Sequence, residues 1–131
     1  MEVQVVSPEQ VLYTGNADMV VARTLGGGEI AFLRDHAPFL GALDASPVRL
    51  ILADGRQEQF AVHGGFVEVS HDHVIILSDV AELPGEIDLE RALAAKMRAE
   101  EVLRITPDDY DATVALQRAE TRIAVAQSHL G

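Results

Sequence analysis

Four arginines in the last third of the chain are spaced so that they could bind an anion. Arg91 and Arg98 lie seven residues apart, and Arg118 and Arg122 lie four residues apart. If the two segments are antiparallel helices, all four guanidinium groups could lie along one edge. Guanidinium groups match phosphate or carboxylate oxygens and repel one another without such anions. The alternative is surface ion pairing with the neighbouring glutamates Glu90, Glu101 and Glu120.

Three histidines form a candidate metal site. His71 and His73 could place two imidazoles on one face of a strand, and His63 could supply a third ligand. The favoured alternative is an exposed turn without a metal, because no carboxylate follows at the spacing of known metal motifs. We therefore expect no metal and no catalytic residue, and keep a small metal-dependent β-sandwich enzyme as the alternative function. His36, beside Pro38, could be a hydrogen-bonded turn residue or an interface contact.

Composition excludes several classes of protein. The 131 residues are 48% hydrophobic, include no cysteine and carry a net charge of −11. An acidic chain repels phosphates, so nucleic acid is not an expected partner. The absence of cysteine excludes disulfides and suits a reducing compartment. With no apolar run of membrane-spanning length and no basic leader followed by an apolar stretch, we expect neither a signal peptide nor a membrane-spanning helix.

The periodicity of apolar residues changes between Ala81 and Ala92. Before this stretch, apolar residues mostly recur at every second position, as in strands, and after it at every third or fourth, as in helices. Pro84 and Gly85 interrupt both patterns. We therefore predict two domains, a β domain over residues 1–84 and a helical domain over residues 85–131.

The β domain is predicted to be a β-sandwich or flattened barrel of eight to ten short strands. Val3 and Val5 alternate with polar residues, as in a half-buried strand. Asp54-Gly55 is a strong hairpin signal, because both residues tolerate a positive φ. Gly64-Gly65 is expected to separate two further strands.

The helical domain is predicted to be an antiparallel hairpin. Asp88 can cap the first helix, because its carboxylate can accept a hydrogen bond from a free backbone N–H of the first turn. Thr106 is expected to cap the second helix, with Pro107 at its first position. A small apolar seam would join the helices, at Ala112, Ala115, Leu116, Ala119, Ile123, Ala126 and Leu130. Such a hairpin is marginally stable alone and needs a docking surface, a ligand or a partner.

Several motifs together resemble the epsilon subunit of the F-type ATP synthase. The stretches GGGEIAFLRDHAPFLGAL and HGGFVEVSHDHVIILSDVAELPGEIDLERA are similar to that family's glycine-glutamate loop, H-A-P-L-L turn, G-G-F-x-E-V strand and acidic entry into a helical pair. The resemblance covers essentially the whole chain in order. It implies a ten-stranded β-sandwich followed by a helix-turn-helix.

The resemblance also implies a non-catalytic rotor subunit that couples proton-driven rotation of the c-subunit ring to ATP synthesis. Its implied partners are the gamma subunit, the c ring, and the alpha and beta subunits when the helices extend. It would lie at the cytoplasmic face of the cell membrane as a peripheral part of the complex. The implied contacts with the ring are Gly28, Glu29, Ile30 and His36.

Some members of this family bind ATP through an I/L-D-x-x-R-A motif, and the resemblance extends to this site. The matching residues are Ile87, Asp88, Arg91 and Ala92. Arg98, Arg118 and Arg122 match further arginines, and Glu82 matches an acidic residue near the site. ATP would then be a regulatory ligand, with no cofactor required. By this resemblance, the folded hairpin permits rotation and the extended hairpin inhibits ATP hydrolysis.

Overall fold

The computed structural model describes residues 1–130, and of Leu130 the backbone only. Gly131, the last residue of the predicted helical domain, and the Leu130 side chain of the predicted seam lie outside the described residues. The strands are β1 (Glu2–Val6), β2 (Val11–Asn16), β3 (Met19–Thr24), β4 (Gly28–Leu33), β5 (Phe39–Ile51), β6 (Gln57–Ser70), β7 (His73–Leu77) and β8 (Ala81–Glu82). A 3-10 turn η1 (Pro84–Glu86) leads to helices α1 (Leu89–Ile105) and α2 (Tyr110–Leu130).

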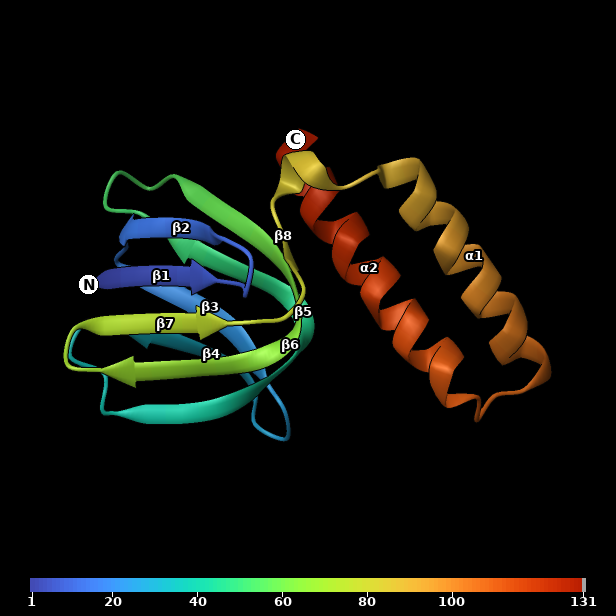
Figure 1. Ribbon diagram of the computed structural model, residues 1–131, viewed down its shortest axis with the longest axis horizontal. Helices are drawn as coiled ribbons and strands as arrows, with labels where there is room; N and C mark the ends of the chain where they lie inside the picture. The colour runs from blue at the N-terminus through green and yellow to red at the C-terminus, as the bar shows by residue number, and fades with distance from the viewer. Residues whose placement is uncertain (131) are drawn as a thin grey trace.

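The strands fold into a β-sandwich, as the sequence predicts, with the hairpin against one side (Figure 1). Hydrogen bonding follows the order β2-β1-β7-β6-β5-β3-β4, and β8 pairs with β6. In β1 and β7 the buried core residues alternate with less buried ones, whereas β3 and β6 each contain three buried residues in a row. The largest side chains of the core have almost no exposed surface; they include Phe32, Leu50, Phe60 and Ile76. This apolar burial holds the sandwich together.

The structure describes eight strands, within the eight to ten that the sequence pattern predicts and fewer than the ten that the resemblance implies. Residues 39–51 form the single strand β5, and β6 continues through Gly64-Gly65, which was expected to separate two strands. These glycines have φ angles of +93° and +119°, so the strand bends there and stays paired with β5. At Gly65 a Cβ would lie 2.1 Å from the carbonyl oxygen of Leu77. The bend therefore requires glycine, and it carries β6 through both layers of the sandwich.

The two helices form the predicted antiparallel hairpin, and α2 lies between the sandwich and α1 (Figure 1). Asp88 caps α1 as expected, since its Oδ1 accepts a hydrogen bond from the backbone N–H of Arg91 at 3.1 Å. Ala112, Ala119 and Ala126 recur every seven residues along α2 and are buried. Small side chains at this spacing allow helices to pack closely.

The predicted start of the second helix is wrong. Thr106 ends α1, because its backbone N–H donates to the carbonyl of Val102. Asp109 begins the next helix, where its Oδ1 accepts a hydrogen bond from the backbone N–H of Ala112 at 2.9 Å. Asp109 can take this role because Pro107 and Asp108 form the turn between the helices.

Candidate functional site

A pocket of about 340 Å³ lies where β8, η1 and the start of α1 meet the later part of α2. Its volume falls in the range of small-molecule sites. The lining residues are Glu82, Glu86, Ile87, Asp88, Arg91, Ala92, Ala95, Arg98 and Arg122. Seven of the eight residues predicted to bind ATP are therefore brought together. The eighth, Arg118, is exposed on α2 and is not among the lining residues.

Local helix geometry positions the α1 side of the pocket. Arg91 and Arg98 are two turns apart and project from the same side of the helix. Ala92 and Ala95 lie between them, and their small side chains leave space for a ligand. The capping bond of Asp88 fixes where α1 begins, and the positive end of the helix dipole lies at this point.

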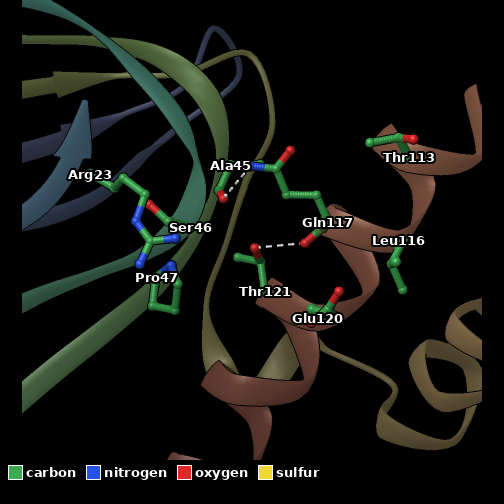
Figure 2. A pocket seen from close by; sticks show the side chains of 9 residues that line it. All are labelled: Arg23, Ala45, Ser46, Pro47, Thr113, Leu116, Gln117, Glu120 and Thr121. Atoms are coloured by element: carbon green, nitrogen blue, oxygen red, sulfur yellow. Dashed lines mark hydrogen bonds between the residues drawn. The ribbon is translucent and has the colours of Figure 1, made fainter. Parts of the chain in front are cut away.

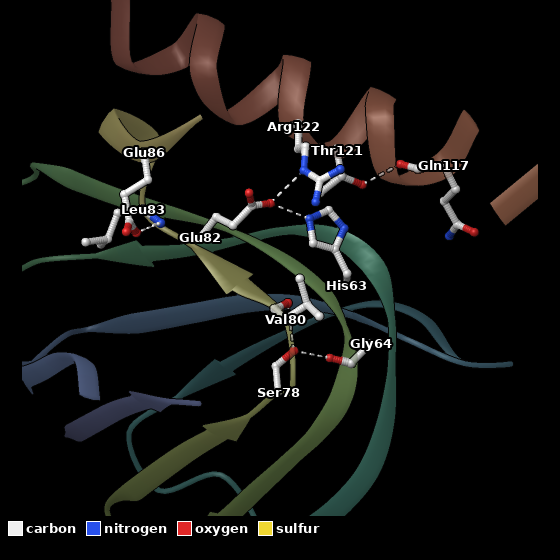
Figure 3. A network of polar contacts seen from close by, with 10 residues as sticks. All are labelled: His63, Gly64, Ser78, Val80, Glu82, Leu83, Glu86, Gln117, Thr121 and Arg122. Carbon is white, nitrogen blue, oxygen red and sulfur yellow. Dashed lines mark hydrogen bonds and ion pairs between the residues drawn. The ribbon is translucent and has the colours of Figure 1, made fainter. Parts of the chain in front are cut away.

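Glu82 joins the sandwich to the helical hairpin. Its Oε1 lies 2.8 Å from His63 Nε2 on β6 and accepts a hydrogen bond from Arg122 Nε on α2 at 2.7 Å (Figure 3). The hydrogen bonds from His63 and then Arg122 outweigh burial and hold the pKa of the Glu82 carboxyl below its ordinary value of 4.5. Glu82 is therefore ionised at neutral pH.

The carboxylates of the pocket already have partners. Asp88 accepts the capping hydrogen bond, and Glu86 Oε1 accepts one from the backbone N–H of Leu83 at 3.0 Å. Within residues 1–130, Arg91 and Arg98 form no ion pair, so the predicted surface pairing does not account for them. The pocket therefore has guanidinium donors available for an anion, and phosphate and carboxylate are the oxygen groups that they match.

A second polar contact holds α2 to the sandwich. The side-chain amide of Gln117 donates to Asp44 Oδ1 at 2.7 Å and to the carbonyl of Ala45 at 3.1 Å. Figure 2 shows Gln117 reaching the strand beside a pocket that is also lined by Arg23 and Thr121. Because Gln117 and Arg122 lie five residues apart on one helix, the two contacts together fix how α2 lies on the sandwich.

The four residues expected to contact the c ring do not form a compact cluster. Gly28, Glu29 and Ile30 begin β4, whereas His36 lies in the turn that follows the strand. The length of β4 separates Gly28 from this turn by roughly 17 Å. The His36 ring packs edge-on against Phe32, with the centroids 4.9 Å apart. β4 is an edge strand of the sheet, so among the described residues its outer side has no strand partner.

The three candidate metal ligands are far apart or occupied. His63 contacts Glu82, while His71 and His73 lie at the far end of β6, where His73 Nδ1 is 4.0 Å from Glu2 Oε2. In the part of the chain that the structure describes, no three His, Cys, Asp or Glu side chains are grouped to hold a metal.

Sequence reasoning missed the role of His63 as the partner of Glu82, and it also missed Glu86 and Ala95 in the pocket lining. His63 and Glu82 are 19 residues apart, so no local spacing could indicate their contact. Glu86 and Ala95 adjoin the predicted motif, and helical periodicity from Arg91 and Arg98 could have found Ala95.

Over the residues described, neither helix has the length and hydropathy needed to cross a membrane.

Comparisons with known proteins match both parts of the chain. The family model for the ATP synthase delta/epsilon chain, beta-sandwich domain, matches residues 1–84, and that for its long alpha-helix domain matches residues 86–127. The ATP synthase epsilon chain of Brevibacillus brevis is 50% identical over 103 residues, covering 79% of this chain and 77% of the relative. The ATP synthase epsilon chain of Shouchella clausii is 44% identical over 130 residues, covering 97% of this chain and 95% of that relative.

A solved structure supports the same fold. A chain in the cryo-EM structure of the Euglena gracilis mitochondrial ATP synthase, which contains OSCP, F1 and the c ring, matches with a TM-score of 0.72 at 21% identity. The match covers 98% of this chain and 80% of that chain.

Proposed function

The chain belongs to the ATP synthase delta/epsilon family, and from that premise we propose that its hairpin is an ATP-sensitive brake on the rotary enzyme. The chain is a non-catalytic subunit of the epsilon type in the central stalk of an F-type ATP synthase. The metal-dependent enzyme considered as an alternative is therefore set aside. The proposal concerns what the hairpin senses and what it contacts.

The observation that carries the nucleotide proposal is the pocket between the docked hairpin and β8. Three arginines line it, and two of them form no ion pair within residues 1–130. Ile87 and Ala92 supply apolar surface for a base, while the guanidinium groups supply donors for phosphates. ATP would thus act as a regulatory ligand, and Arg118, outside the lining, would contribute less than Arg122.

ATP would favour the docked hairpin because the pocket has walls from both domains. Glu82 belongs to β8, whereas Arg122 belongs to α2, so extension of the hairpin would take the site apart. A ligand that binds only one state stabilises it by about 2.7 kcal/mol at a hundred times its dissociation constant. When ATP falls, the released helices would extend toward the alpha and beta subunits and inhibit hydrolysis.

The sandwich would connect the gamma subunit to the c ring and transmit torque between them. We place the ring contact along β4, at Gly28, Glu29 and Ile30, with His36 at the end of the strand. All four residues can reach the ring if β4, an edge strand, lies lengthwise against it. The subunit would then be peripheral, at the cytoplasmic face of the cell membrane, where proton flow drives the ring.

Calorimetric titration of the isolated protein with ATP, ADP and GTP tests the nucleotide proposal. We expect selective binding of ATP and an affinity about tenfold or more lower in Arg122→Ala, since a charge-assisted contact is lost. Arg104→Ala is the matched control, because Arg104 pairs with Glu101 at 2.7 Å near the end of α1, outside the pocket. An unchanged affinity in Arg122→Ala, or no binding at millimolar ATP, would contradict the assignment.

A further inference from the structure

His63 is buried directly behind the pocket without lining it. It lies on β6 next to the glycine bend, and its side chain has no exposed surface. In Figure 3 the imidazole points toward Glu82, beneath Arg122 and Thr121 of α2. A buried histidine at an interdomain contact requires a reason, because burying a polar ring without partners is costly.

The hydrogen bond between His63 and Glu82 has a defined direction. Glu82 is an ionised carboxylate, which can only accept, so His63 Nε2 must carry the hydrogen and donate it. The same oxygen, Oε1, also accepts from Arg122 Nε. Donors from the sandwich and from the hairpin therefore hold a single carboxylate oxygen.

This arrangement sets the direction of the Arg122 guanidinium. The bond to Glu82 uses Nε and leaves the four N–H groups on the two Nη atoms for an anion in the pocket. Because the guanidinium is planar and rigid, fixing Nε fixes where those donors point. The other side chain that holds the same Glu82 oxygen is His63, so His63 helps to fix the position from which Glu82 binds Nε.

We propose that His63 is a positioning residue for the nucleotide pocket, which fixes Glu82 and thereby orients Arg122 toward phosphate. The inference rests on the proposed ATP site and adds to it a residue that never contacts the ligand. It also gives the sandwich a direct influence on affinity, although the arginines all belong to the helices.

The test is calorimetric titration of full-length variants with ATP. His63→Phe keeps an aromatic ring but removes the donor, and we expect about tenfold weaker binding, the loss expected when a charge-assisted hydrogen bond is removed. His63→Gln places an amide N–H near the position of Nε2 and should restore most of the affinity. His71→Phe is the matched control, because His71 lies in an exposed turn at the far end of β6.

A double-mutant cycle separates positioning from a general structural effect. In the Arg122→Ala background, His63→Phe should cause no further loss of ATP affinity, because the group that it orients is gone. Equal losses in both backgrounds would overturn the proposal. If His63→Phe does not fold, as judged by circular dichroism, His63→Leu replaces it in the same cycle, since it also removes the donor at position 63 and leaves Glu82 in place.

The outcomes distinguish this inference from the proposed function. Wild-type binding of ATP with full affinity retained in His63→Phe would refute the role of His63 and leave the pocket assignment intact. No binding of ATP by the wild type would refute both. We expect ATP affinity to fall in His63→Phe and to be largely restored in His63→Gln. We also expect His63→Phe to cause no further loss in the Arg122→Ala background.

Discussion

Glu82 is the residue on which the docked arrangement depends most directly. It is the only carboxylate in the described part of the chain that accepts hydrogen bonds from side chains of both domains, from His63 at 2.8 Å and Arg122 at 2.7 Å. Sequence analysis placed Glu82 and Arg122 in one site through family resemblance. It could not find His63, because that contact forms only where β6 bends and β8 pairs beside it.

The lowered pKa of Glu82 predicts that the hairpin undocks at acid pH. A group with a depressed folded-state pKa stabilises the folded form above its unfolded pKa, here about 4.5, and loses that contribution as pH falls through the folded value. The stability difference between wild type and Glu82→Gln should therefore be largest near neutral pH and shrink as the pH falls below about 4.5.

Thermal unfolding across this pH range measures the difference. Glu100→Gln, which removes an exposed carboxylate from α1, is the control and should show a small difference that varies little with pH. A constant difference between wild type and Glu82→Gln at every pH would show that the charge of Glu82 does not support docking.

At the scale of elements, local patterns were the most predictable. The cap at Asp88, the burial of Ala112, Ala119 and Ala126 on α2 and the strand alternation of β1 depend on neighbours in the sequence, and these predictions are confirmed. Ala115, which the sequence also placed in the apolar seam, is exposed instead. Errors arose where long-range packing decides, as at Gly64-Gly65, where pairing with β5 continues the strand through a pair of glycines. The predicted cap of α2 was also wrong, because two nearby residues could fill it. Asp109 rather than Thr106 is the N-cap of α2.

Gln117 is expected to stabilise the docking of α2 on the sandwich. In Gln117→Ala, two hydrogen bonds to Asp44 and Ala45 are lost, while Asp44 Oδ1 keeps the backbone N–H of Ala45 at 3.0 Å. The docked state should lose about 1 kcal/mol, and α2 amides should exchange hydrogen about fivefold faster. Gln127→Ala, at an exposed position of the same helix, should leave the rates unchanged. Equal rates in Gln117→Ala and wild type would contradict this role.

At the scale of the whole molecule, the sandwich is the rigid part and the hairpin is the part that we expect to dock and undock. The core cluster of the sandwich consists entirely of residues before position 84, so its packing does not require the helices. The hairpin, by contrast, packs mainly through alanines, with Val125 as its one large fully buried side chain among the described residues, and through two polar contacts. Sequence periodicity indicated this division. The way in which the two parts dock could not be predicted, because it depends on side chains that are distant in the chain.

Hydrogen exchange of the isolated protein with and without ATP tests most directly whether ATP selects the docked hairpin. At ATP about a hundred times its dissociation constant, buried α2 amides such as those of Thr121 and Val125 should exchange about a hundredfold more slowly. In Arg122→Ala at the same concentration, the slowing should largely disappear. If ATP saturates the protein and leaves the α2 rates unchanged, binding is not linked to docking, and the brake is not set by nucleotide.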